Sequence, residues 1–78
     1  MAKAASEEVF LLDGEFVELN QLLKLVGVVD SGGAGKVLVA SGAVSVDGAQ
    51  ELRKTAKIRA GQLVQVAGLP LRVRVKQS

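Results

Sequence analysis

The 78-residue sequence predicts a single α+β domain in which two N-terminal helices pack on a small antiparallel sheet. Two changes of pattern support this fold class: apolar residues repeat with helical spacing near residue 20, and they alternate with polar residues after residue 42. The short chain leaves room for one domain only. We expect a flexible terminus over residues 1–8 and the domain over residues 9–78. The apolar run at residues 9–12 fits a buried strand or a lid over the core.

The first helix is indicated by a stripe of apolar residues at positions i, i+3, i+4 and i+7. Its members are Leu19, Leu22, Leu23 and Val26. Gly27 follows the stripe and is typical of a helix end. We interpret the stripe as core packing.

The second helix is predicted to begin at Asp30 or Ser31, because either side chain can cap the free N–H groups of a first turn, and to end before Gly42. Its first turns contain three glycines, which are poor helix formers: Gly32, Gly33 and Gly35. One interpretation is that N–H groups at this helix start bind a phosphate, assisted by Lys36. The other is that the glycines let the two helices pack closely, and the sequence leaves both open. A nucleotide-hydrolysing phosphate loop is excluded, because Asp30 and Val37 occupy positions that its motif reserves for Gly and Ser or Thr.

The strands follow the second helix. Val44 and Val46 alternate with a polar residue, and Asp47-Gly48 is a preferred pair for a type I′ hairpin turn whose second strand we place at residues 50–53. A terminal hairpin is predicted from residues 63–67 and 71–75. In its last strand we expect Leu71, Val73 and Val75 to point inward and Arg72 and Arg74 outward.

Absent residue types exclude several functions. The chain has no Cys and no His, so zinc fingers, thiol nucleophiles and Ser-His pairs are excluded. Its acids are spaced singly, without a converging carboxylate pair, and we expect no enzyme activity, no cofactor and no metal. Phe10 and Phe16 are its only aromatic residues, which predicts that it lacks the platforms on which many RNA-binding sheets stack bases.

The charge is divided unevenly along the chain. Residues 1–51 hold all eight acids and three lysines, whereas residues 52–78 hold seven Lys and Arg and no acid. The densest group lies in residues 53–59, the basic segment, and consists of Arg53, Lys54, Lys57 and Arg59. Such a group is often only a solvated surface, but a field of one sign attracts polyanions. The sequence shows neither a secretory signal nor a long apolar run, and we expect a cytoplasmic monomer.

The order of motifs resembles the RNA-binding domain named after ribosomal small-subunit protein S-four, over residues 16–67. The motifs are the leucine stripe ending at residues 23–27, the Ser-Gly opening at residues 31–36, the Gly-to-Val-Asp-Gly hairpin at residues 42–48 and the Gly turn at residues 58–62. Within this family the chain looks most like the stand-alone bacterial YbcJ-like group, with its Arg-Lys-x-x-Lys-Ile run.

The resemblance implies an α-L RNA-binding fold and RNA contacts from the start of the second helix and from the loop after the hairpin. These contacts carry over to Ser31, Gly32, Lys36, Arg53, Lys54 and Lys57. Gly32 departs from the family, which usually has an Arg there. To these residues we add Arg59 from the basic segment.

These observations predict a non-catalytic bacterial module that binds structured RNA, ribosomal or tRNA-like, in association with the ribosome or translation. The alternative is a protein-interaction domain that docks on an acidic partner or offers its terminal strand for sheet addition.

Overall fold

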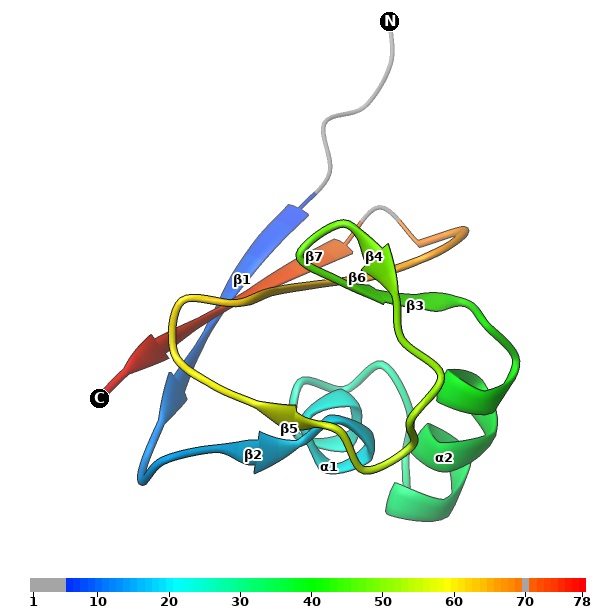
Figure 1. Ribbon diagram of the computed structural model, residues 1–78, viewed down its shortest axis with the longest axis horizontal. Coiled ribbons are helices and arrows are strands. Elements are labelled where there is room, and N and C mark those ends of the chain that lie inside the picture. Colours follow the sequence, from blue (N-terminus) through cyan, green and yellow to red (C-terminus); the bar gives the residue numbers. More distant parts are fainter. Residues whose placement is uncertain (1–5, 70) are drawn as a thin grey trace, which may run out of the picture.

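Two helices and a two-stranded ribbon cover one face of a five-stranded sheet (Figure 1). The structure is a computed structural model that describes residues 6–69 and 71–78. Along the chain the elements are β1 (Ser6–Leu12), β2 (Val17–Glu18), α1 (Leu19–Leu25), α2 (Gly32–Ala40), β3 (Val44–Val46), β4 (Ala49–Gln50), β5 (Lys57–Ile58), β6 (Leu63–Val66) and β7 (Leu71–Gln77). The sheet has the order β1-β7-β6-β3-β4, and β2 pairs with β5 in the ribbon. No helix in the described ranges is long and apolar enough to cross a membrane.

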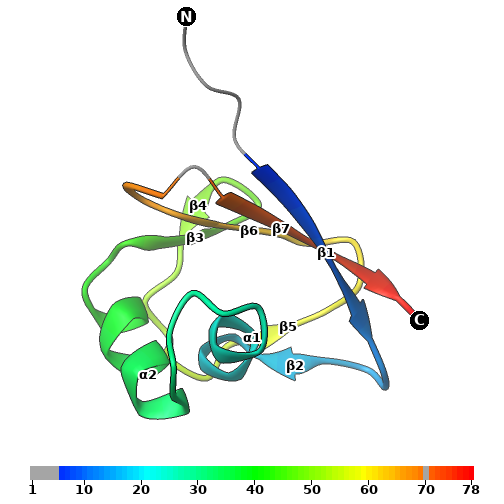
Figure 2. The same ribbon diagram turned by 180° about the vertical axis from the view of Figure 1, so that it is seen from behind.

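The strand β1 corrects the predicted fold. It precedes both helices and pairs in parallel with β7, from Ser6 opposite Leu71 to Leu12 opposite Gln77, so the sheet is mixed rather than antiparallel (Figure 2). Residues 6–8 therefore lie in a strand, whereas the sequence assigned them to a flexible terminus; residues 1–5 of that terminus lie outside the described residues. Because β7 lies between β1 and β6, the terminal strand has no free edge, and the idea that it offers itself for sheet addition is wrong.

The predicted hairpins are present with shorter strands. Asp47 and Gly48 have φ values of 52° and 84°, as a type I′ turn requires. The Asp47 carboxylate also accepts a hydrogen bond from the Leu63 N–H at 2.9 Å, which ties this turn to the start of β6. The second strand covers only Ala49–Gln50, so Arg53 lies in the following loop and not in a strand over residues 50–53.

The core lies between the sheet and the helices. The α1 stripe contributes Leu19, Leu22 and Leu23, all fully buried, as predicted. On β7, Val73 and Val75 are buried and Leu71 packs against the core partly buried, as predicted, while Arg72 and Arg74 are partly exposed. The ribbon adds Ile58, which is 1% exposed, so its inner face is fixed to the same core.

The helices α1 and α2 approach most closely at Gly35. A Cβ atom on this residue would lie 2.5 Å from the backbone oxygen of Asn20 and 3.0 Å from its Cα. No side chain fits at these distances, so close helix packing explains Gly35. Gly33 differs, because a Cβ there would meet only the Ser31 hydroxyl, at 4.0 Å.

We predict opposite effects for two Gly-to-Ala substitutions in α2. Gly35→Ala forces the α1 backbone away and should lower the free energy of unfolding by about 1–3 kcal/mol. Gly33→Ala meets open space and improves helix propensity, so it should be neutral or stabilising by up to about 1 kcal/mol. Urea unfolding followed by circular dichroism measures both, and equal stability of the two variants would contradict the close contact.

Candidate nucleic-acid interface

The basic segment is fastened to the start of α1 by its backbone. Glu18 precedes the helix but makes no capping hydrogen bond with its side chain. Instead, the N–H of Leu19 donates to the Ala56 carbonyl at 2.9 Å, and the N–H of Asn20 donates to the Lys54 carbonyl at 3.2 Å. These bonds satisfy helix N–H groups that would otherwise lack partners, and they fix where the basic segment lies.

Asn20 connects the same place to the start of α2. Its side chain is 1% exposed, and its Nδ2 donates to the Gly32 carbonyl at 3.4 Å. Its backbone is the surface on which Gly35 packs. The residue thus holds the basic segment through its N–H and the α2 start through its side chain. Sequence reasoning did not single out Asn20, because one Asn on a helix gives no signal of such a role.

The α2 start has the predicted cap. The Ser31 Oγ accepts a hydrogen bond from the Ala34 N–H at 3.0 Å, which selects Ser31 over Asp30 as the capping residue. Within the described residues, the N–H groups of Gly32 and Gly33 meet no hydrogen-bond acceptor. Gly33 is exposed and Gly32 partly so. Both N–H groups are therefore available to an anion at the positive end of the helix dipole.

The predicted cations differ in their pairing. Arg53 bonds to Glu51, with Nε to Oε2 at 3.0 Å and Nη2 to Oε1 at 3.1 Å. This pair was not predicted, because Glu51 was counted with the acidic residues 1–51 and Arg53 with the acid-free residues 52–78, although the two are only two positions apart. The other predicted cations are exposed and form no ion pair within residues 6–69 and 71–78; they are Lys36, Lys54, Lys57 and Arg59.

The pairing of Arg53 changes the acid-base properties of its partner. Hydrogen bonds from the Arg53 side chain and N–H lower the pKa of Glu51 below its ordinary value of 4.5. The same contact raises the pKa of Arg53. At neutral pH both groups are charged, and the negative charge of Glu51 offsets part of the field of Arg53, whose side chain remains 81% exposed.

The outer face of the ribbon carries an aromatic contact that the sequence did not reveal. The Lys57 Nζ lies 5.0 Å from the centroid of the Phe16 ring, and the Arg59 Cζ lies 5.8 Å from it. These distances are typical of cation–π interactions. Phe16 is 39% exposed, and the sequence cannot distinguish such a phenylalanine from one in the core.

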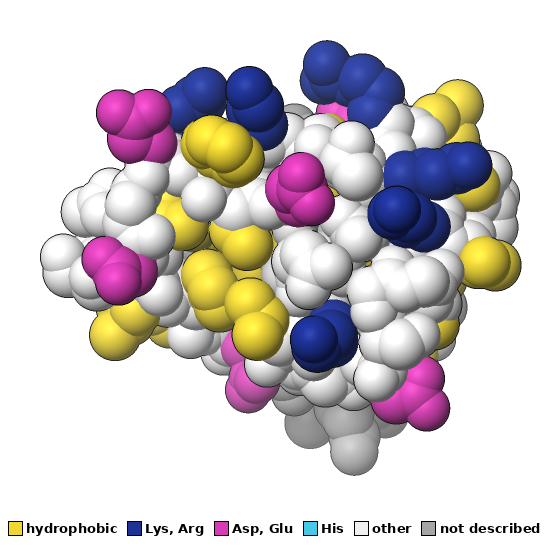
Figure 3. Space-filling model, turned by 90° about the horizontal axis from the view of Figure 1, so that it is seen from below, with side chains coloured by type: hydrophobic (Ala, Val, Ile, Leu, Met, Phe, Trp, Pro, Cys, Tyr) yellow, Lys and Arg dark blue, Asp and Glu magenta, His cyan; other side chains and the backbone are white. Residues whose placement is uncertain are grey.

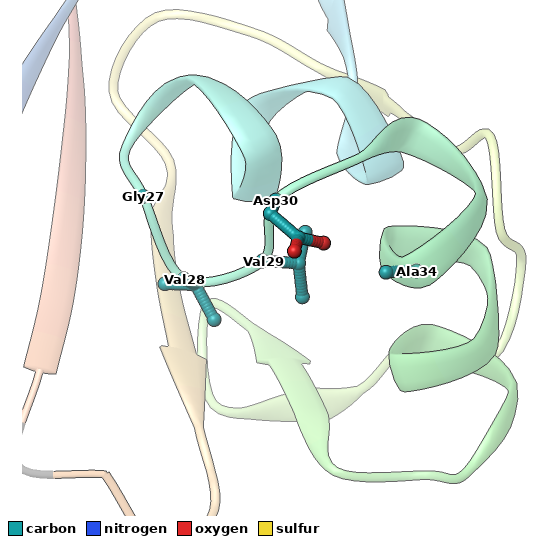
Figure 4. A pocket seen from close by; sticks show the side chains of 5 residues that line it. All are labelled: Gly27, Val28, Val29, Asp30 and Ala34. Carbon is teal, nitrogen blue, oxygen red and sulfur yellow. The ribbon is translucent and has the colours of Figure 1, made fainter.

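Two shallow hollows open near these elements. Arg53, Thr55, Ala56 and Lys57 line one of about 460 Å³, which lies on the basic segment itself. The other lies between the end of α1 and the start of α2, and its lining offers only small or apolar residues and the Asp30 carboxylate (Figure 4). The first suits a phosphate, whereas the second has no cation to hold one.

The face formed by the helices and the ribbon is seen in Figure 3. Lys and Arg side chains follow one long rim of this face, and acidic side chains are interspersed among them. The acid-free stretch of sequence thus does not become a surface free of acids. The backbone of the basic segment lies against the start of α1, and its Lys and Arg side chains are exposed there.

Comparison with known proteins agrees with this arrangement. The family described as the S4 domain matches residues 10–74, which is most of the chain. This chain belongs to the S4 domain family. Membership confirms the resemblance found in the sequence motifs.

Two relatives of this S4 domain come from enteric bacteria. This chain is 53% identical over 57 residues to the "Putative RNA-binding protein YbcJ" of Escherichia coli (strain K12). The match covers 73% of this chain and 81% of the relative. YbcJ of Shigella flexneri matches to the same extent. The solution structure of E. coli YbcJ, described as revealing an α-L motif involved in RNA binding, superposes with a TM-score of 0.62 at 44% identity over 95% of this chain and 91% of that one.

The ion pair of this S4 domain makes its stability depend on pH. Because the pKa of Glu51 is lowered in the folded state, the pair stabilises fully above about pH 5, and its contribution is lost as the pH falls through the lowered pKa. Glu51→Gln should therefore be less stable than the unmodified protein at pH 7, and this difference should disappear in acid.

Thermal unfolding of both proteins at several pH values from about 7 down to about 3 measures the difference in stability. Glu15→Gln is the control, since Glu15 is exposed and makes no ion pair in the described ranges. A pH-independent deficit of Glu51→Gln would contradict the proposed cause.

Proposed function

We propose that this S4 domain binds structured RNA, ribosomal or tRNA-like, without catalysis. The observation that carries the proposal is the fastening of the basic segment and the α2 start to one buried residue, Asn20. This arrangement holds exposed cations and free helix N–H groups in a fixed relation, as a rigid phosphate backbone requires. The RNA-binding descriptions of the YbcJ relatives support it.

Each group has a definite part in the proposed contact. Lys54, Lys57 and Arg59 meet phosphates along the basic segment, and Lys36 meets one on α2. Ser31 shapes the α2 start, whose Gly32 and Gly33 N–H groups donate hydrogen bonds to a phosphate oxygen. Arg53 contributes less than its position suggests, because Glu51 already occupies its guanidinium. Position 32, where the family usually has an Arg, supplies an N–H group but no cation.

The surface favours recognition of RNA shape over base sequence. Amino groups and backbone N–H groups recognise phosphates and 2′-hydroxyl groups, which are the same in every structured RNA. We therefore propose a bacterial cytoplasmic protein that acts on, or close to, the ribosome or tRNA, as a monomer.

Removing one cation of the basic segment should weaken binding and reduce its salt dependence. For about four to six phosphate contacts, log affinity should fall against log salt with a slope of about −0.7 to −0.9 per contact. Lys54→Gln should make this slope shallower by about one contact for any structured RNA.

Lys76→Gln is the matched control, because it removes the same charge from an exposed site on β7. Filter binding to an rRNA hairpin over a salt titration tests both variants. Equal losses for the two would show that binding follows net charge and not this face. If the combined Arg53→Glu, Lys54→Glu and Lys57→Glu variant kept its RNA affinity, an acidic protein partner would become the better hypothesis.

RNA affinity should stay nearly constant between about pH 6 and pH 8. The chain has no His, and no other ordinary side chain titrates in that range. The same binding assay at constant ionic strength measures this, and a sharp transition would contradict the proposed phosphate contacts.

A further inference from the structure

The outer face of the β2–β5 ribbon brings together an aromatic ring and two cations. Val17 lies opposite Ile58, and Glu18 lies opposite Lys57. Continuing this register by one residue places Phe16 opposite Arg59. Side chains of a strand alternate between its faces, so Phe16, Glu18, Lys57 and Arg59 share the outer face while Ile58 enters the core.

We propose that Phe16, Lys57 and Arg59 form a stacking site for one unpaired nucleotide of the bound RNA. This inference rests on the proposed RNA-binding function and adds to it a second kind of contact. The base would stack on the Phe16 ring or on the adjacent Arg59 guanidinium plane, both of which are flat surfaces that accept bases. Its phosphate would meet the Lys57 ammonium group.

The combination, and not the exposure of one apolar side chain, carries the argument. Single exposed apolar residues are common on protein surfaces. Here, however, the ring is 39% exposed and has two cationic groups within 6 Å of its centroid. Neither cation forms an ion pair within the described residues. Aromatic faces beside free positive charge are the shared feature of sites that hold single-stranded nucleic acid.

The ribbon also holds this site in place before any ligand binds. Ile58 anchors its inner face in the core, and the Arg59 N–H donates to Gln62 Oε1 at 2.7 Å. Fixed side-chain positions reduce the ordering cost of binding. Glu18 lies opposite Lys57 on this face, and its negative charge disfavours a further phosphate beside it.

The site is continuous with the proposed duplex contact. Lys57 belongs to the basic segment and also lines the hollow shared with Arg53 and Thr55. A structured RNA that contacts Lys54 would therefore direct a neighbouring unpaired nucleotide toward Phe16. We expect the preferred RNA to be a helix with a bulge or a single-stranded end, not a blunt duplex.

Two RNAs and two substitutions of Phe16 test the proposal. The RNAs are a blunt hairpin closed by a tightly stacked tetraloop, which offers no free base, and the same hairpin with a short unpaired extension at its open end. The unmodified protein should bind the extended hairpin about fivefold to tenfold more tightly, from the stacking of one base. Phe16→Leu keeps apolar bulk but loses the aromatic face, so it should lose this preference and bind the blunt hairpin unchanged. Phe16→Tyr should restore the preference.

A fluorescence measurement reports the contact directly. Since the chain contains no Trp, Phe16→Trp introduces a single reporter, whose emission should be quenched by the extended hairpin more than by the blunt one. Leu69→Trp is the control, because Leu69 is exposed in the turn between β6 and β7, which belong to the five-stranded sheet and not to the β2–β5 ribbon.

The outcomes separate this inference from the function on which it rests. Equal affinity of the unmodified protein for the two hairpins, or an equal loss for both in Phe16→Leu, overturns the stacking site and leaves RNA binding intact. Unchanged Phe16→Trp emission on saturation with the extended hairpin also overturns it. Failure to bind either hairpin overturns the proposed function together with the stacking site.

Discussion

The crossing of α1 and α2 at Asn20 is the contact on which the rest of the structure depends. Gly35 lets the α2 backbone lie against the Asn20 backbone, and the Asn20 side chain donates to the Gly32 carbonyl. The Asn20 N–H meanwhile holds the Lys54 carbonyl. One buried residue thus relates two helix starts and the basic segment to one another. A larger residue at position 35 would disturb both the packing and the proposed phosphate contacts.

Using backbone carbonyls to cap α1 has an electrostatic consequence. The start of a helix repels cations, yet the basic segment lies against it. The Ala56 and Lys54 carbonyls turn their negative ends toward the α1 N–H groups, while the side chains of this segment remain exposed. The cations are therefore kept at the surface while the first N–H groups of α1 keep backbone partners.

Local patterns predicted the elements that depend on local interactions. The leucine stripe, the Ser31 cap and the Asp47-Gly48 turn each involve residues within a few positions of one another, so their signals lie in the sequence. The parallel pairing of β1 with β7 joins opposite ends of the chain, and a short apolar run does not specify a partner so distant. The helix-first, antiparallel arrangement was wrong for this reason.

The sequence by itself determined the family, the two helices and the set of cations from which an RNA-binding surface can be built, because composition and short motifs are properties of the chain. Only the tertiary structure decided which cations remain unpaired. It brought Glu51 onto Arg53, placed Phe16 beside Lys57 and Arg59, and assigned Gly35 to helix packing while leaving the Gly32 and Gly33 N–H groups free. The Glu51–Arg53 pair depends on side-chain conformation, whereas the Phe16 contacts and the packing of Gly35 on Asn20 join residues far apart in the sequence, so short motifs specify none of them.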